Sequence, residues 1–278
     1  MIGFVGSVFS PWYAWSGRRD PAHHCCLNVV TYGPGGRFTM TDRGRSALRQ
    51  SRDALQIGPS RMAWQNGSLV IDVNEISALP RISRVRGQIR LTPTAITEVE
   101  ALLTPDARHI WRPLAPSARI EVDLSQGHSW SGHGYLDANF GQAALEADFQ
   151  RWTWGRYPRA HGGTTCFYDG IRTDGSTLAL GLDVTTDGTA AQIGLPPLTP
   201  LAPTGWRIRR DARCDAGERP RQVKALLDTP FYSRSVVQTR IAGESVTGVH
   251  EALDLTRFRR PIVKAMLAFR VPRRANWG

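Results

Sequence analysis

The sequence lacks any apolar run long enough to cross a bilayer. A transmembrane helix takes about 20 consecutive apolar residues, and the apolar stretches of this 278-residue chain are much shorter. Residues 1–10 are apolar, but they have no basic leader and meet Pro11 at once. We therefore interpret them as a strand rather than a signal peptide, and we expect a globular chain without a membrane-spanning helix.

Cysteine is scarce and irregularly spaced. The chain has four cysteines, which are Cys25, Cys26, Cys166 and Cys214. This pattern is unlike the disulfide framework of small secreted domains and favours reduced thiols in the cytosol. Two histidines at positions 23 and 24 precede the first cysteine pair and suggest a metal site, but adjacent residues of a strand point to opposite faces. We therefore assign no metal.

Lysine is almost absent, and arginine carries the positive charge. The net charge is +11 at pH 7, yet Lys224 and Lys264 are the only lysines. A basic surface favours nucleic acid or anionic lipid as a partner. The arginines are scattered, and the sequence has no helix-turn-helix, zinc-finger or RNA-binding signature. We therefore expect no nucleic-acid partner and retain an anionic membrane surface as a candidate partner.

Short strand-like segments separated by turn residues fill most of the chain. Asn66-Gly67 lies between two such segments and predicts a hairpin with a type I′ turn. Asp174-Gly175 predicts another hairpin. This pattern predicts an all-β fold, a barrel or a sandwich, with few short helices. The number of strands allows one closed sheet to end near Asp148, which gives two domains, residues 1–148 and 149–278.

Two stretches have a helical pattern. One is residues 46–55. The other is residues 261–269, where Pro261 suits a first helical turn and the apolar side chains cluster towards one side. Cations surround this second segment, namely Arg257, Arg259, Arg260, Lys264, Arg270, Arg273 and Arg274. The segment either packs on a barrel or contacts a membrane as a basic amphipathic helix, and the sequence leaves both open.

One strand-like stretch, residues 130–141, carries an unusual set of polar side chains. Because strand side chains repeat every second residue, one face holds Ser131, His133, Tyr135, Asp137 and Asn139. A surface strand shows polar alternation too. Two features favour a pocket, since tyrosine and tryptophan are poor surface choices and glycines let a ligand approach a strand closely.

Several blocks of the sequence are similar to one known family. Residues 4–15, 24–34, 130–141, 248–258 and 269–274 resemble, in order, segments of the carotenoid 1,2-hydratases, also called hydroxyneurosporene synthases. The likeness covers nearly the whole chain. It implies tandem lipocalin-like β barrels, a fold shared with tocopherol cyclases and some pericyclases. It also implies cofactor-independent addition of water to the terminal C1–C2 double bond of acyclic carotenoids such as neurosporene and lycopene.

The family's catalytic set is a His-x-Trp pair and a Tyr-x-Asp pair. His109 and Trp111 match the first, and Tyr135 and Asp137 match the second. The pair His128-x-Trp130 also has the first spacing, but it lies too close to Asp137 in sequence to match the family's separation. We expect no bound cofactor and no metal.

Hydration of an unactivated alkene needs an acid that stays protonated at neutral pH. Burial raises a carboxyl pKa, so Asp137 is the predicted acid, and the faces of Trp111 and Tyr135 are predicted to stabilise the tertiary carbocation. His109 shares a strand face with Trp111. It is expected to orient the water, to accept its proton or to hydrogen-bond Asp137. Trp12, Trp15 and Trp130 are candidates either for core packing or for lining a tunnel that holds the polyene.

Two other classes of function remain open on the sequence. The chain could be a carotenoid- or lipid-binding barrel without catalysis, or a cyclase or pericyclase on the same fold. The expected partners are an acyclic carotenoid, an anionic membrane surface and other enzymes of the carotenoid pathway. The expected location is the cytoplasmic side of a bacterial inner, photosynthetic membrane, with peripheral attachment, because a C40 polyene is held in the bilayer.

Overall fold

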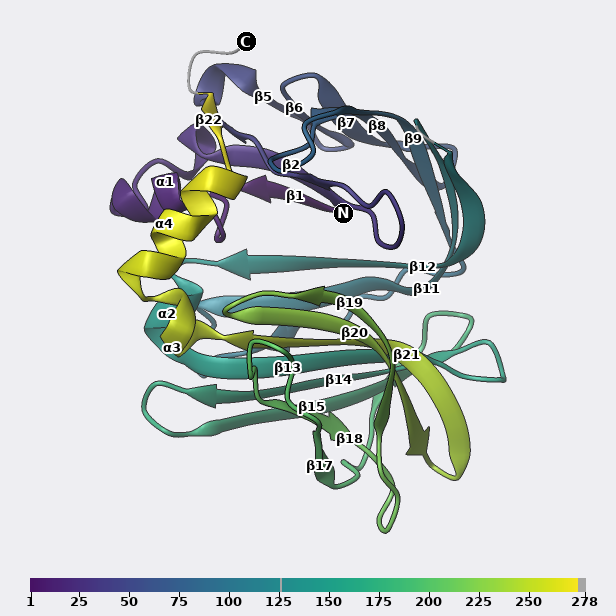
Figure 1. Ribbon diagram of the computed structural model, residues 1–278. Helices are drawn as coiled ribbons and strands as arrows, with labels where there is room; N and C mark the ends of the chain where they lie inside the picture. The colour runs from purple at the N-terminus through teal and green to yellow at the C-terminus, as the bar shows by residue number, and fades with distance from the viewer. Residues whose placement is uncertain (126, 275–278) are drawn as a thin grey trace. The chain divides into compact units, whose positions relative to one another are not determined.

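Strands dominate the computed structural model, which describes residues 1–125 and 127–274 (Figure 1). The all-β prediction is confirmed in its coarse form, as several antiparallel sheets with few short helices. The chain forms two compact units. The first unit comprises residues 1–93, 119–134 and the part from Pro261 onward, and the second comprises 94–118 and 135–260. Tandem lipocalin-like barrels divided after Asp148 stay a prediction.

The first unit contains strands from both ends of the chain. Its strands are β1 Ile2–Val5, β2 Cys25–Val30, β3 Phe38–Thr39, β4 Asp42–Arg43, β5 Leu48–Gln50, β6 Ala54–Ile57, β7 Ser60–Gln65, β8 Ser68–Ile76, β9 Arg84–Pro93 and β22 Arg273–Arg274. Its helical segments are α1 Pro11–Trp15, η1 Pro21–His23, η2 Arg45–Ala47 and α4 Pro261–Arg270. Strands β5 to β9 pair antiparallel in chain order.

The hairpin prediction at Asn66-Gly67 is confirmed. Gln65 pairs with Ser68 across the turn, and φ is +50° at Asn66 and +76° at Gly67, as a type I′ turn requires. The helix prediction for 46–55 is wrong. The segment holds β5 and β6, joined by a tight turn in which Ser51 N donates to Ala54 O at 2.9 Å. Pairing with β7 satisfies this backbone and overrides the weak local helical pattern.

A buried carboxylate ties the C-terminal strand to the first unit. Asp42 is fully buried and accepts hydrogen bonds from Ser10 and from the Arg273 guanidinium, and His24 Nδ1 lies 3.4 Å from its Oδ2. Strand β22, which carries Arg273, pairs parallel with β4. Because a buried charge needs a partner, Arg273 completes the interior of this unit.

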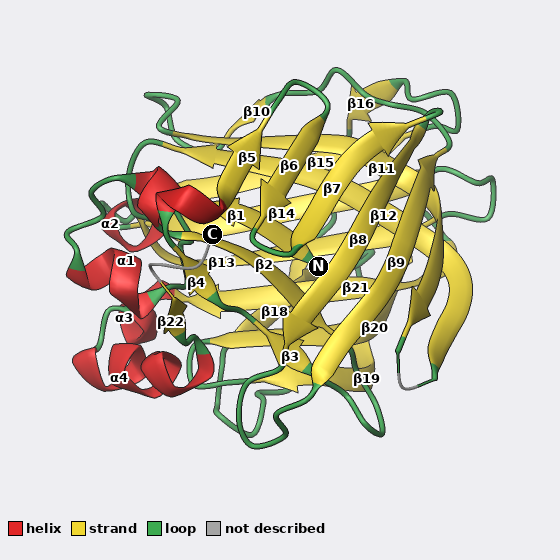
Figure 2. Cartoon of the chain, turned by 90° about the horizontal axis from the view of Figure 1, so that it is seen from above, coloured by secondary structure: helices red, strands yellow, loops and turns green. Residues whose placement is uncertain are grey.

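The helix prediction for residues 261–269 is confirmed by α4, which packs beside α1 (Figure 2). The Trp12 indole donates to Val271 O at 2.6 Å, so Trp12 packs here as a structural residue. Lys264, predicted among the surrounding cations, is instead buried at 7% exposure. Within residues 1–125 and 127–274, no helix has the length and apolar character of a membrane span.

The second unit is built on a seven-stranded antiparallel sheet in the order β16-β15-β14-β13-β21-β20-β19. Its strands are β10 Ala101–Leu102, β13 Phe149–Pro158, β14 Thr164–Arg172, β15 Thr177–Val184, β16 Ala190–Gln192, β17 Leu198–Leu201, β18 Arg210–Arg213, β19 Arg221–Asp228, β20 Tyr232–Ile241 and β21 Glu244–Asp254. Short helices are α2 Leu145–Asp148 and α3 Leu255–Phe258. The turn at Asp174-Gly175 joins β14 to β15 and confirms the second hairpin.

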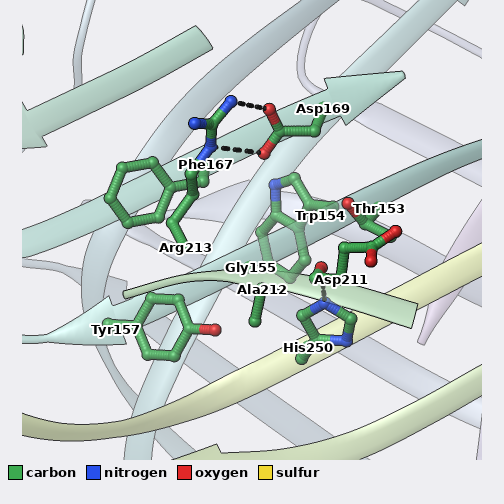
Figure 3. Close-up of a pocket in the computed structure, with 10 residues that line it drawn as sticks. All are labelled: Thr153, Trp154, Gly155, Tyr157, Phe167, Asp169, Asp211, Ala212, Arg213 and His250. Carbon is green, nitrogen blue, oxygen red and sulfur yellow. Dashed lines mark hydrogen bonds and ion pairs between the residues drawn. The ribbon is translucent and has the colours of Figure 1, made fainter. Parts of the chain in front are cut away.

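One face of this sheet holds buried polar groups under β18 (Figure 3). Arg213 pairs with Asp169, and His250 Nε2 hydrogen-bonds the carbonyl oxygen of Asp211 at 2.9 Å. Burial lowers the pKa of His250 to about 4, so this imidazole is neutral at neutral pH. These residues line a small pocket with Tyr157 and Phe167, and none of the predicted catalytic residues is among them.

Two long strands contribute to both units. They are β11 His109–Leu124 and β12 His128–Gly141, which pair with each other. Residues 109–118 of β11 and 135–141 of β12 belong to the second unit. All four predicted catalytic residues lie in these two segments, so the second unit alone positions the site.

Close packing in the second unit predicts that replacing Gly248 destabilises the protein. A Cβ at Gly248 would overlap the carbonyl oxygen of Arg156 and lie 2.7 Å from Tyr157 Cδ1. Gly248→Ala should therefore destabilise the protein by about 2 kcal/mol or more, measured as a fall in the midpoint of thermal unfolding. Gly194→Ala is the control, because nothing lies within 4 Å of its added Cβ. Equal midpoints for both variants would contradict this packing.

Candidate active site

A direct contact joins the two predicted catalytic pairs. Trp111 is fully buried, and its indole Nε1 donates a hydrogen bond to Asp137 Oδ2 at 3.0 Å. Asn139 Nδ2 lies 3.3 Å from the same oxygen. The strand alternation along β12 therefore places Asp137 and Asn139 on one face, towards Trp111 of β11.

The surroundings of Asp137 favour its protonated form. Burial raises the pKa of this carboxyl above its ordinary value. The hydrogen bond from Trp111 works in the opposite direction because it favours the carboxylate, while the charge of Glu251 adds to the rise. The net direction is upward, so Asp137 keeps its proton to higher pH than an ordinary aspartate.

Tyr135 presents a phenol beside this carboxyl. Its hydroxyl oxygen is buried close to the Asp137 carboxyl and the Trp111 indole, without a hydrogen bond of regular geometry among the described residues. Burial, with the nearby charge of Asp137, raises its pKa well above the ordinary value, so the phenol stays neutral. Its ring centroid lies 5.0 Å from that of Trp154, and the Arg156 guanidinium lies over the ring at 5.6 Å.

A row of paired residues crosses four strands of the seven-stranded sheet, on the face opposite to the one that β18 covers. Tyr168 of β14 is opposite Trp154 of β13, Trp154 is opposite Glu251 of β21, and Glu251 is opposite Arg234 of β20. Tyr168 also packs against Trp111, with ring centroids 5.6 Å apart. Aromatic rings of the row thus contact a residue from each predicted pair.

Sequence reasoning missed the contribution of this row to the site. The alternation of aromatic residues over 149–154 and the strand ending at Tyr168 are visible in the sequence. What was missing is the register of β13 with β14 and β21, because nothing local fixes which residues of distant strands stand opposite each other. No motif or spacing in the sequence marks Glu251 as a site residue, although it lies in residues 248–258, one of the blocks that resemble the family.

His109 is connected differently from Asp137. Its ring is buried, and Nε2 hydrogen-bonds Asp148 Oδ2 at 2.7 Å, while Arg108 Nη2 donates to Asp148 Oδ1 at 2.8 Å. The ring also packs edge-on against Phe149 at 5.4 Å. Of the predicted roles for His109, a hydrogen bond to Asp137 is not the bond formed here. The imidazole instead fixes the start of β11, two residues before Trp111.

The remaining sequence candidates lie in the first unit. Trp130 is 53% exposed and Trp15 is 55% exposed, so neither is packed in a core there. His128, the partner of Trp130 in the second His-x-Trp spacing, also belongs to this unit. Within residues 1–125 and 127–274, no three His, Cys, Asp or Glu side chains gather as a metal site would require. The four cysteines are free and buried.

The site thus consists of a half-buried carboxyl that accepts a hydrogen bond from an indole N–H among aromatic rings. The chain matches the family model of "Carotenoid hydratase CrtC" over residues 1–278. It therefore belongs to the carotenoid hydratase CrtC family, and the predicted family and enzyme class, a hydro-lyase, are confirmed.

Relatives with assigned activities are similar over the whole chain. The acyclic carotenoid 1,2-hydratase of Cereibacter sphaeroides is 63% identical over 278 residues, covering 100% of this chain and 99% of that protein. The protein of the same name from Rhodobacter capsulatus is 58% identical with the same coverage. That of Thiocapsa roseopersicina is 50% identical over 98% of this chain and 68% of its own length.

The raised pKa of Asp137 predicts a pH dependence of stability. A carboxyl with a higher pKa in the folded than in the unfolded state stabilises the fold fully below the unfolded pKa. This contribution is lost as pH rises through the folded pKa. Asn cannot ionise, so Asp137→Asn should gain stability relative to the parent as pH rises from acid to neutral, in urea unfolding curves. A constant difference across pH would show that Asp137 titrates normally.

Proposed function

We propose that this chain adds water to the terminal C1–C2 double bond of acyclic carotenoids, neurosporene, lycopene and their derivatives, and gives the tertiary 1-hydroxy product without a cofactor. The observation that carries the proposal is Asp137, a carboxyl with a raised pKa held between aromatic side chains. Two relatives that match over the full length are acyclic carotenoid 1,2-hydratases, which supports the choice of substrate.

The first step is proton transfer from Asp137 to C2 of the terminal double bond. The electron pair of the double bond takes the proton and leaves a tertiary cation at C1. An ordinary aspartate is ionised at neutral pH and has no proton to give. The burial that raises the pKa of Asp137 therefore supplies the acid, and Trp111 aims it through the indole hydrogen bond.

The cation at C1 then needs stabilisation without a competing nucleophile. Aromatic faces provide about 2 kcal/mol or more each when water is excluded. The rings of Trp111 and Tyr135 have this role, with Trp154 and Tyr168 packed behind them. A water molecule attacks C1, and its proton passes to the Asp137 carboxylate, which restores the acid.

Tyr135 and His109 have different parts in this scheme. The Tyr135 hydroxyl is buried close to Asp137 without a hydrogen bond of regular geometry among the described residues, and in this scheme it binds the attacking water. His109 is a positioning residue, because its bond to Asp148 fixes the start of β11 and thereby the orientation of Trp111.

Replacement of the acid tests the function. Asp137→Asn keeps the shape of the side chain and loses the acidic proton, so hydration of lycopene in detergent should fall by about 10²–10⁴-fold. Product mass measures the added water. Asp123→Asn, an exposed carboxylate elsewhere on β11, is the control and should keep parental activity. A parent product of unchanged mass would instead indicate a cyclase or a binding protein.

We further propose that the protein works peripherally at the cytoplasmic surface of the bacterial inner, photosynthetic membrane, because its substrate is held in the bilayer. The support is an apolar face on α4, where Ile262, Met266 and Phe269 are 65%, 42% and 75% exposed. Trp15 of the neighbouring α1 adds an exposed indole, a side chain favoured at membrane interfaces.

The structure changes which contacts are expected to dominate at the membrane. Lys264 is buried, and the Arg270 guanidinium donates to the carbonyl oxygen of Leu79. Arg257 donates to the carbonyl oxygens of Trp206 and Pro230. Several of the cations counted from the sequence are thus engaged within the protein, so attachment should depend more on apolar insertion than on charge.

Liposome sedimentation tests this attachment. Replacing Ile262, Met266 and Phe269 together by serine should lower binding to anionic liposomes by about tenfold or more, with detergent activity retained. Salt should release the parent only in part, since it screens charges and leaves apolar contacts intact. Ile82→Ser is the control, an exposed apolar residue in a loop of the same unit. A triple variant that sediments like the parent would exclude α4 as the contact.

A further inference from the structure

We propose that Glu251, held by Arg234, is a positioning residue for catalysis, whose carboxylate charge adds to burial in keeping Asp137 in its acid form. The predicted catalytic set contains neither Glu251 nor Arg234. The inference rests on the proposed function in one respect, namely that Asp137 is the acid. Its geometric basis is the row of residues that crosses the central strands of the second unit.

The register places Glu251 beside the site. It stands directly opposite Trp154, and directly opposed residues of antiparallel strands have Cβ atoms about 5 Å apart on the same face. The Trp154 ring is 5.0 Å from the ring of Tyr135. Tyr135 and Asp137 project from the same side of β12, so the carboxylate and the acid flank the same aromatic rings.

Arg234 determines how strongly the Glu251 carboxylate acts on the protonation of Asp137. Its Nη1 lies 3.3 Å from Glu251 Oε1, and the two side chains are 29% and 18% exposed. The guanidinium therefore offsets part of the carboxylate charge. The remaining charge acts on Asp137 from a side chain that is mostly shielded from solvent, so water screens it only in part.

The other ionisable groups around Asp137 do not supply this negative charge. They are Tyr135, His109 with its partner Asp148, Arg156, Cys166, Tyr168 and Arg234. Burial raises the pKa of Cys166 to about 12 and that of Tyr168 further, so both are neutral. Arg156 is a buried cation that donates to Pro116 O and works in the opposite direction. Asp148 is matched by Arg108 and His109. The negative charge is therefore that of Glu251, the carboxylate of the row.

Two substitutions with opposite effects test the proposal. Activity needs protonated Asp137, so the rate falls as pH rises through the pKa of Asp137. Glu251→Gln removes a negative charge, and the alkaline limb of the pH–rate profile should move to lower pH by about 0.5–1 unit. Arg234→Gln leaves the Glu251 charge uncompensated, and the same limb should move to higher pH. A purely structural ion pair would lower stability in both variants and leave the limb in place.

Glu244→Gln is the matched control. Glu244 begins β21, pairs with Arg159 at 2.7 Å and belongs to the same sheet, but it lies outside the row. Its pH–rate profile should overlay the parent. Profiles of Glu251→Gln and Arg234→Gln that coincide with the parent, or that shift in the same direction, would overturn the proposal.

A direct titration of Asp137 separates this proposal from the proposed function. The infrared carbonyl band of a protonated carboxylic acid is followed against pH, and the component missing in Asp137→Asn is assigned to Asp137. The midpoint should fall in Glu251→Gln and rise in Arg234→Gln even if the parent hydrates no carotenoid. Unmoved midpoints in an active enzyme would refute the role of Glu251 and leave the hydratase function intact.

Discussion

The hydrogen bond between the Trp111 indole and the Asp137 carboxyl is the interaction on which the site depends. It fixes the Asp137 carboxyl in position, but it also stabilises the carboxylate and so opposes the protonation that the proposed reaction needs. Burial, which raises the pKa of Asp137, must therefore have a larger effect than this hydrogen bond, which lowers it. The surrounding rings provide that burial and, through their faces, also suit the cation of the proposed reaction. In the proposed reaction, one apolar environment thus serves both the protonation of Asp137 and the stabilisation of the cation.

The seven-stranded sheet of the second unit uses its two faces differently. One face packs polar groups under β18, where Arg213 pairs with Asp169 and His250 is neutral. The opposite face carries Trp154, Tyr168 and Glu251 towards the ends of β11 and β12. Strand alternation separates these sets by a single residue, so a shift of register by one would exchange them.

Local patterns predicted the hairpins, α4 and the strand around Asp137, and the family motifs supplied the two residue pairs to which Trp111 and Asp137 belong. They failed where distant strands decide the outcome. Residues 46–55 form two strands because β7 pairs with them, and His109 bonds Asp148 because α2 lies beside the start of β11. Lys264 is buried although its local sequence is that of a surface helix. None of these contacts has a signature within a short window.

The composition of the first unit constrains the order in which the protein matures. Its interior needs Arg273 against Asp42 and β22 beside β4, and residues 261–274 are synthesised after all the strands of the second unit. The second unit has all its strands available earlier, since it ends at Arg260. During translation the strands of the second unit can therefore pair first, while Asp42 lacks its partner Arg273 until that residue has been added and has left the ribosome.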